Sequence, residues 1–272
     1  MPLNLSGNII SATTVNYTGI TENYPNIVKT NLNLWLDAGR SFSHWNARYY
    51  DCGYGCQYYS TDPGCTNCNT YWTDLSVSYG KCTMNNGALL DYANGGSISF
   101  DGTNDNVTVP YNSYTMDFSS YQTICMWLKP ITGADSARRN PYNHAYGGSG
   151  TLTRETNGTI TYFFGTNGGD STPYVGVASQ FTVAENELAF ITVTRSQPDN
   201  VCRWYKNGVW DNNSNSAGGY TTTTNTTSNI LIGQGYVSNW IGNIYVVALY
   251  NKFFTADEVL QNYNADRNRF GM

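Results

Sequence analysis

Four cysteines that lie within 17 residues of one another are the part of the chain best suited to metal or redox chemistry. Cys52, Cys56, Cys65 and Cys68 have the spacing C-x3-C-x8-C-x2-C, which brings two close pairs together, as a tetrahedral zinc site of four thiolates requires. Zinc would order this loop, which is rich in glycine and tyrosine and too small to form a hydrophobic core of its own. The same residues could instead form disulfides or stay reduced. The spacing alone leaves these three states open.

The other three cysteines lie far from one another in the sequence. Cys125 and Cys202 each fall in an alternating, strand-like run, so we expect both to behave as small buried hydrophobic residues. Cys82 follows the cysteine-rich segment and could pair with one of its thiols, which would break the symmetry of a four-thiolate site.

Sequence patterns that accompany catalysis are missing. The chain contains no E-x-D-x-E strand, which would supply the paired carboxylates of a retaining glycosidase. It also lacks G-x-S-x-G, H-E-x-x-H and a phosphate-binding loop. Its two histidines, His44 and His144, fall in segments that we expect to be loops. We therefore expect a protein that is not an enzyme.

The elements that must position these residues are short strands between turn signals, a pattern typical of an all-β sandwich or barrel. The predicted strands are Asn33–Asp37, Ser97–Asp101, Asn106–Val109, Gln122–Lys129, Thr151–Arg154, Thr159–Phe164, Leu188–Arg195, Val201–Lys206, Asn229–Gly233 and Ile241–Tyr250.

Two local signals set the connections near the C-terminal end. Asn207-Gly208 predicts a two-residue hairpin that pairs Val201–Lys206 with the residues after it, because a type I′ turn needs positive φ at both positions. Thr255 and Glu258 form a capping box, which predicts a helix over Ala256–Tyr263. The tail from Asn264 to Met272 should lie on the surface.

Composition excludes several classes of protein. Only 12% of the 272 residues are charged and 15% are aromatic, and the net charge is −5, so the surface must be covered by neutral polar groups that suit packing against other molecules. We expect no binding to nucleic acid, because the 14 basic residues are scattered. No apolar run is long enough to span a membrane. Residues 1–25 have neither a basic nor an apolar region of the kind found in signal peptides, so we expect none there. Residues 1–28 are expected to form an extended N-terminal arm, ordered only against the rest of the chain or a partner.

An ordered set of short motifs resembles a known family. Leu34-Trp35-Leu36-Asp37-Ala38-Gly39, Gly95-Gly96-Ser97-Ile98-Ser99-Phe100-Asp101-Gly102 and Trp204-Tyr205-Lys206-Asn207-Gly208 are similar to segments of concanavalin A-like, laminin-G-type domains. The resemblance covers about residues 33–263. It implies a jelly-roll sandwich of two antiparallel sheets over 29–272, interrupted by the cysteine-rich insertion at 43–71.

The beginning and end of this region are most similar to domains of structural proteins in tailed bacteriophages. The resemblance implies a virion component, such as a capsid decoration, fibre or appendage protein, assembled in the host cytoplasm beside other virion proteins. We expect a homo-oligomer, although no heptad pattern selects its size. Disulfides in the insertion stay the alternative to zinc, because a virion works outside the cell, where thiols oxidise, although assembly in a reducing cytoplasm disfavours early bonds.

Calcium is the usual ion of this family. Carboxylates suit it as hard oxygen ligands, and the resemblance places four of them at strand ends, namely Asp37, Asp74, Asp101 and Asp105. The alternative is that these residues form turns, in which an Asp side chain bonds to its own backbone.

Lectin sites of the family combine aromatic rings with polar side chains. The surface candidates for binding host-surface glycans are Tyr142, His144, Tyr146, Tyr174 and Trp240. We therefore expect a non-enzymatic virion protein that stabilises the particle or adheres to the host surface. The alternative function is a calcium-dependent carbohydrate-binding module.

Overall fold

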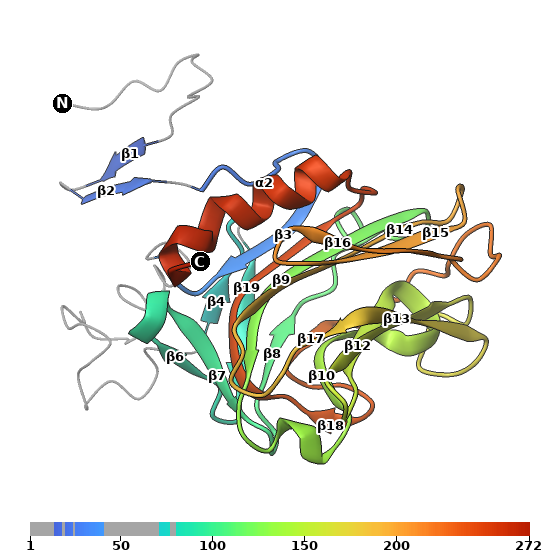
Figure 1. The fold of residues 1–272 in the computed structure, drawn as a ribbon, viewed down its shortest axis with the longest axis horizontal. Helices are drawn as coiled ribbons and strands as arrows, with labels where there is room; N and C mark the ends of the chain where they lie inside the picture. The colour runs from blue at the N-terminus through green and yellow to red at the C-terminus, as the bar shows by residue number, and fades with distance from the viewer. Residues whose placement is uncertain (1–13, 18–19, 24, 41–70, 77–79) are drawn as a thin grey trace.

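The computed structural model describes residues 14–17, 20–23, 25–40, 71–76 and 80–272. Within these residues the strands form two large sheets that pack face to face, and an α-helix near the C-terminus covers the outside of one of them (Figure 1). The pairing in both sheets is antiparallel except between β10 and β18. These features confirm the predicted all-β sandwich with a short C-terminal helix.

The first sheet has nine strands within the described residues. Its order is β13–β12–β11–β10–β17–β8–β5–β4, and β18 pairs with β10. The strands are β4 (Tyr71–Thr73), β5 (Lys81–Asn85), β8 (Asn106–Val109), β10 (Arg139–His144), β11 (Gly150–Arg154), β12 (Thr159–Gly165), β13 (Tyr174–Thr182), β17 (Ile230–Ile232) and β18 (Ser238–Asn239).

The second sheet has eight strands in the same part of the chain. Its order is β16–β15–β14–β9–β19–β7–β6, and β3 pairs with β19. The strands are β3 (Leu32–Asp37), β6 (Leu89–Asp91), β7 (Ser97–Asp101), β9 (Tyr121–Pro130), β14 (Ala189–Ser196), β15 (Val201–Lys206), β16 (Val209–Asn215) and β19 (Ile241–Tyr250).

All ten predicted strands are present, with ends that agree within one residue. Six further strands of the two sheets, and most of β16, were not predicted from the sequence; the six are β4, β5, β6, β10, β13 and β18. Strand β10 has the sequence R-N-P-Y-N-H, which lacks β-branched residues, yet all six residues are buried. Several polar side chains of this strand are buried because they form hydrogen bonds, such as that from Asn140 to the Leu152 carbonyl, so a polar sequence here does not indicate an exposed segment.

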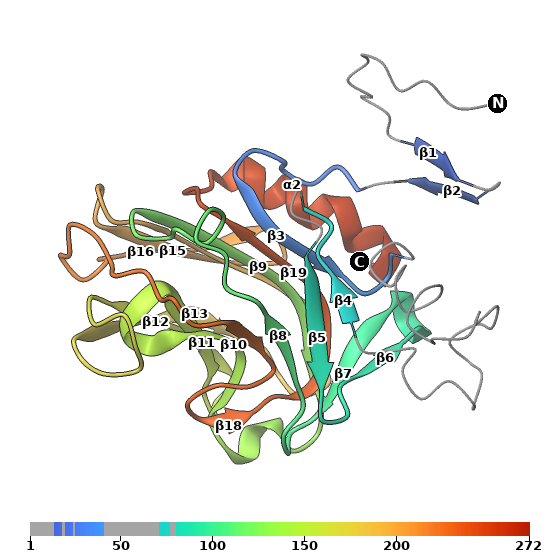
Figure 2. The same cartoon turned by 180° about the vertical axis from the view of Figure 1, so that it is seen from behind.

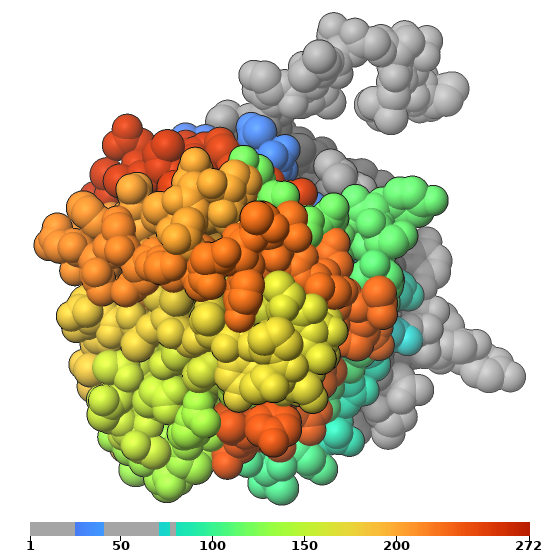
Figure 3. All heavy atoms as spheres, turned by 90° about the vertical axis from the view of Figure 1, so that its right-hand side faces the viewer, coloured from blue at the N-terminus to red at the C-terminus, as the bar shows by residue number. Residues whose placement is uncertain are grey.

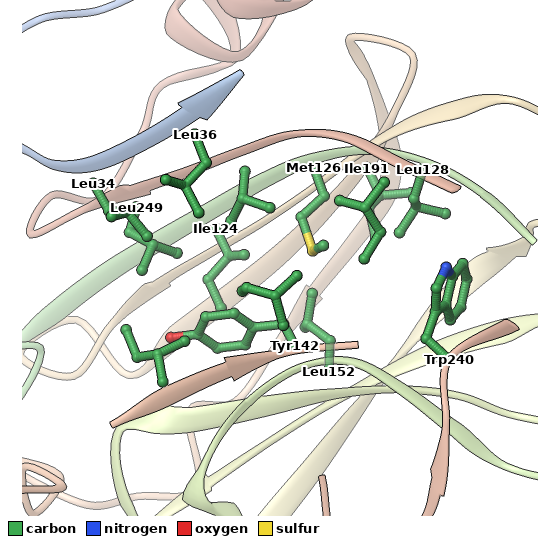
Figure 4. Packing of buried hydrophobic residues seen from close by; sticks show 14 of the residues in the cluster. Leu34, Leu36, Ile124, Met126, Leu128, Tyr142, Leu152, Ile191, Trp240 and Leu249 are labelled. Carbon is green, nitrogen blue, oxygen red and sulfur yellow. The ribbon is translucent and has the colours of Figure 1, made fainter. Parts of the chain in front are cut away.

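The main core lies between the two sheets. Leu36 of β3, Met126 of β9 and Ile191 of β14 project from the second sheet toward Tyr142 and Leu152 of the first (Figure 4). These side chains are buried, and apolar burial of this kind is the dominant favourable contribution to folding. The two sheets therefore hold the strand ends and loops in fixed relative positions.

A second core covers the other face of the second sheet, beneath the helix α2 (Ala256–Asp266). Trp127 of β9 stacks on Tyr263 of α2, with ring centroids 5.6 Å apart, and Val259 is fully buried. Because β9 and β14 are covered on both faces, they read as nearly continuous buried runs. The predicted capping box is confirmed, since Thr255 accepts from the Glu258 amide and Glu258 accepts from the Thr255 amide.

The predicted hairpin is also confirmed. Asn207 and Gly208 both have positive φ, at 51° and 79°, and Lys206 pairs with Val209 across the turn. Only residues that tolerate the left-handed region at low cost suit these positions, so the local sequence alone determined this connection.

Residues near both ends of the chain contact the rest of the domain. Within the predicted arm, β1 (Thr14–Tyr17) and β2 (Ile20–Asn23) pair with each other. Ile27 and Val28 are buried against the domain, and the Val28 amide donates to Asn262 of α2. The prediction that the tail lies on the surface is wrong for Asp266, which is buried. The Arg269 guanidinium enters an ion-pair cluster with Asp37, where Nη1 lies 2.7 Å from Oδ1.

Candidate functional site

Two of the five aromatic residues predicted to bind glycans come together on the first sheet. Tyr146 and Tyr174 join Phe163 and Tyr236 in one group, here called the aromatic platform. The ring of Tyr146 is the common member, with centroid distances of 4.7 Å to Phe163, 5.8 Å to Tyr174 and 5.7 Å to Tyr236. Tyr174 and Tyr236 both meet Tyr146 edge to face, so they stand as raised rings beside it.

The platform is built from four separate segments of the chain. Phe163 and Tyr174 lie on the neighbouring strands β12 and β13. Tyr146 lies in the turn Ala145–Ser149 after β10, and Tyr236 lies in the loop between β17 and β18. In the view of Figure 3, a yellow segment from between residues 150 and 200 lies against orange segments from beyond residue 200.

Close backbone contacts hold Tyr146 in place. Gly147 donates its amide to the Gly169 carbonyl and accepts from the Gly168 amide, both at 2.7 Å. A Cβ on Gly147 would lie 2.1 Å from the Ser171 carbonyl oxygen, so this approach requires glycine. The Tyr146 amide also donates to Asp170, at 3.0 Å. The loop after β12 is thereby fastened to the turn that carries the tyrosine.

Hydrogen bonds fix the far end of the same ring. The Tyr146 hydroxyl lies 2.6 Å from the Thr153 hydroxyl and accepts from the Asn140 amide at 3.3 Å. Tyr146 is therefore held at both its backbone and its hydroxyl, and it forms a rigid floor. A preorganised floor lowers the conformational entropy lost when a ligand binds.

The exposed rings and one ion pair define what the platform presents to solvent. Tyr236 is 72% exposed and Tyr174 is 38% exposed. The guanidinium of Arg138 lies 5.6 Å from the Phe163 ring centroid and forms two hydrogen bonds with Glu155. These hydrogen bonds raise the pKa of Arg138. The cation beside the rings is therefore already paired, and the exposed carboxylate of Asp170, which accepts the Tyr146 amide, is a further charge next to them.

The structure corrects four of the glycan candidates, which were predicted to lie at the surface. Tyr146 is only 4% exposed, so Tyr174 and Tyr236 are the rings of the platform that reach the surface, and Tyr142, His144 and Trp240 are fully buried. Tyr142 points into the core between the sheets, and Trp240 packs in the same core (Figure 4). The ring of His144 lies 3.0 Å from the Ser228 carbonyl oxygen through Nε2, and burial lowers its pKa to about 4. None of the three rings offers a face to a ligand.

The four predicted calcium ligands are spread over three places. Asp37 is fully buried and forms ion pairs with Arg40 and Arg269. Asp74 is buried and accepts hydrogen bonds from the amides of Trp35 and Ser76. Both carboxylates are therefore already neutralised or satisfied, which does not suit a cation site.

Asp101 and Asp105 are the two predicted ligands that the structure brings together. Asp105 accepts from the Asp101 amide at 2.9 Å, and Asp101 accepts from the Thr103 amide at 2.7 Å. These bonds support the alternative interpretation as turn residues. One oxygen of the buried Asp105 has no partner within the described residues. No group of three histidines, cysteines or acidic residues suited to a metal occurs in that part of the chain, so calcium stays a prediction, centred on this pair.

The cysteine-rich cluster lies outside the described residues, since Cys52, Cys56, Cys65 and Cys68 all fall between 41 and 70. The three remaining cysteines are buried and free. Burial raises the pKa of Cys125 and of Cys202 to about 12. Both lie in the packed cores as predicted.

Three residues of the site were not predicted from the sequence, namely Phe163, Tyr236 and Arg138. The strand pattern could have indicated Phe163. Phe163 belongs to a predicted strand in which Ile160, Tyr162 and Phe164 face the core. Alternation therefore places Phe163 on the outer face. Tyr236 and Arg138 lie in loops without periodicity, so no local pattern could have placed them beside β12.

Comparison with known proteins agrees with this architecture. Residues 101–260 match the family model described as the concanavalin A-like lectin/glucanases superfamily. No curated protein matches the chain significantly. Among the described residues, no helix combines the length and the apolar character needed to cross a membrane.

Three solved structures illustrate the shared fold. The binding domain of Paraclostridial mosquitocidal protein 1 has a TM-score of 0.64 at 17% identity, over 88% of this chain and 53% of that one. The receptor-binding domain of botulinum neurotoxin D has a TM-score of 0.60 at 13% identity, over 86% and 52%. This chain thus spans about half the length of these toxin domains.

The third structure is aligned over its whole length. Domain 4 of AbnA, a GH43 extracellular arabinanase from Geobacillus stearothermophilus, was solved in complex with arabinotriose. It has a TM-score of 0.57 at 13% identity, over 87% of this chain and 100% of that domain.

Proposed function

The chain belongs to the concanavalin A-like lectin/glucanase superfamily, and on that premise we propose that it is a carbohydrate-binding domain without enzymatic activity. The observation that carries the proposal is the aromatic platform, where Tyr174 and Tyr236 stand exposed beside the fixed ring of Tyr146. Sugar rings pair an apolar face with a rim of hydroxyls. Tyrosine suits such a ligand, because it pairs an apolar ring with a polar hydroxyl.

The charge of the platform supports a neutral saccharide as the ligand. Arg138 is the cation beside the rings, and Glu155 already takes its hydrogen bonds. An anionic sugar would have to break that pair or remain unpaired. A neutral sugar can instead stack on the rings and reach the tyrosine hydroxyls without displacing either charge.

The surroundings of the glutamates support binding without catalysis. Glu155 pairs with Arg138, Glu187 with Lys206 and Glu258 with Lys252. A retaining glycosidase needs two carboxylates about 5–5.5 Å apart that are free to exchange protons. Each of these glutamates is instead engaged by a cation.

We place this binding function on a virion. The support is the sequence resemblance to phage structural proteins. In addition, only 12% of the residues are charged, and a surface of neutral polar groups suits lateral contacts in an assembly. Saccharide binding would then serve adhesion to the host surface, and the expected homo-oligomer would strengthen a weak site through multivalency. The N-terminal arm is the better candidate for an anchor, because Arg269 and Phe270 of the C-terminal tail pack on the domain itself.

A glycan array tests the binding proposal. We expect the wild-type chain to bind neutral glycans, and Tyr174→Ala with Tyr236→Ala to weaken binding by about tenfold or more, the loss expected when aromatic anchors are removed. Tyr121→Ala serves as the matched control, since Tyr121 is similarly exposed but lies on the second sheet. A blank array, or a double variant that binds as well as the control, contradicts the proposal.

Chelation and truncation test the remaining parts. Calcium-dependent binding predicts that a chelator abolishes the array signal, and an unchanged signal contradicts the calcium requirement. Deletion of residues 1–23 leaves Ile27 and Val28 in place against the domain. The truncated chain should fold but fail to enter particles, and undiminished incorporation overturns the proposed anchor.

A further inference from the structure

A hollow of about 450 Å³ lies at the opposite edge of the first sheet from the aromatic platform. The platform sits on β12 and β13, which begin the strand order, whereas the hollow is bordered by β8 and β5, near its other end (Figure 2). Its outer wall is the loop that joins β8 to β9, residues 110–116. The two sites share no residue.

The hollow combines an apolar floor with a polar wall. Leu34, Cys82 and Val109 form buried parts of its lining. Ser113 and Thr115 line the wall, and their hydroxyls have no hydrogen-bond partner within the described residues. Hydroxyls that lack an internal partner are free to exchange hydrogen bonds with a ligand.

An exposed aromatic ring stands on the same wall. Tyr114 is 96% exposed, so it makes almost no contact with its own chain, although its backbone is fixed. Its amide donates to the Asn112 side chain at 2.9 Å, and the amides of Thr115 and Met116 donate to the Asn112 carbonyl. The loop is a closed turn, which reduces the entropy lost when a ligand binds.

The charge around the hollow restricts its ligand. Among the described residues that line it, none is lysine, arginine or histidine, and the charged one is Asp74. Asp74 accepts hydrogen bonds from the Trp35 and Ser76 amides and from the Ser76 hydroxyl. A lining without a basic side chain among these residues offers no cationic partner to an anionic ligand.

We propose that this hollow binds a neutral sugar residue, so that one chain carries two saccharide sites at opposite edges of the first sheet. The volume lies at the small end of the range of about 300–1,000 Å³ for ligand pockets, which suits one or two sugar rings. The proposal rests on the proposed function for its class of ligand, but it uses different residues. Two sites on one chain would allow bivalent attachment to a branched or repeating glycan.

Nuclear magnetic resonance titration of the full chain tests the second site directly. The probes are glucose, galactose, mannose, N-acetylglucosamine and arabinotriose, each raised to about 50 mM so that millimolar affinities are detected. We expect at least one probe to shift the amide signals of residues 110–116. Those shifts should persist when Tyr174→Ala and Tyr236→Ala remove the platform.

A paired substitution then links the shifts to the hollow. Ser113→Ala with Thr115→Val removes two hydroxyls at nearly constant shape, and we expect roughly tenfold weaker binding at residues 110–116. Thr227→Val with Ser228→Ala is the matched control, because both side chains are exposed elsewhere. Binding at 110–116 that the hollow variant leaves unchanged overturns the proposal, and so does an absence of shifts there with every probe. Loss of the platform site alone refutes only the proposed function.

Discussion

Arg269 anchors the C-terminal tail through ion pairs with two buried carboxylates. Its replacement by methionine tests whether these ion pairs stabilise the fold. Its Nη1 lies 2.7 Å from Asp37 and 3.5 Å from Asp266. The two carboxylates are almost completely buried, and Arg40 is the other cation that contacts them. Removing Arg269 therefore leaves two buried negative charges with one partly exposed cation.

The cost follows from the burial of the pair. Breaking a buried ion pair by removing one partner costs about 3–5 kcal/mol. Arg269 is 15% exposed and Arg40 remains, so we expect about 3 kcal/mol, the lower end of that range. For a domain of this size, about 2–4 °C of Tm is lost per kcal/mol, which predicts a Tm lower by about 6–12 °C.

The pH dependence gives a sharper signature. Burial and the neighbouring Asp37 raise the pKa of Asp266 from 3.8 to about 6. The folded state then binds this proton more tightly than the unfolded state, so stability falls as the pH rises from about 4 to about 6. Without Arg269 the pKa rises further and the fall extends to higher pH. The loss of Tm should thus be larger at about pH 8 than at about pH 5.

Calorimetry of both proteins at the two pH values provides the measurement. Arg267→Met is the control, since Arg267 lies in the same short turn, is exposed, and forms only a cation–π contact with Tyr263 among the interactions described. A loss below about 1 °C, or an equal loss at both pH values, would refute the assignment of Arg269 as the partner of both carboxylates.

Three further predictions follow from local contacts. Thr255→Ala removes the N-cap of α2 and should cost about 1 kcal/mol, seen as a shift in the denaturation midpoint; an unchanged midpoint contradicts the role of the cap. Burial raises the pKa of Cys125 and of Cys202 to about 12, so both thiols should resist thiol reagents at about pH 8 until the protein unfolds. Rapid labelling of the folded chain would count against their burial. His144, with a pKa lowered to about 4, should stay neutral in NMR titrations between about pH 5 and about pH 8, and stability should fall as the pH drops from 6.5 toward 4; a midpoint near 6.5 would show that the ring is solvated.

Local sequence was sufficient wherever one segment determines its own structure. The Asn207-Gly208 turn and the Thr255–Glu258 capping box were both predicted from neighbouring residues, because their hydrogen bonds and dihedral angles are local. Strands with clear alternation, such as β7 and β12, were found for the same reason. Strand β10 was missed because its sequence, R-N-P-Y-N-H, has neither β-branched residues nor an alternation of apolar and polar residues.

The candidate site depended on tertiary structure. Tyrosine is so abundant in this chain that composition could not distinguish buried Tyr142 from exposed Tyr174. Strand pairing decides whether each of these two rings faces the core or the solvent. Close glycine contacts fold the turn that carries Tyr146 over the sheet. The sequence by itself therefore determined the sandwich and its helix, because burial repeats with the period of each element. The tertiary structure alone decided which rings meet at the surface, because those rings come from four segments that strand pairing and loop contacts bring together.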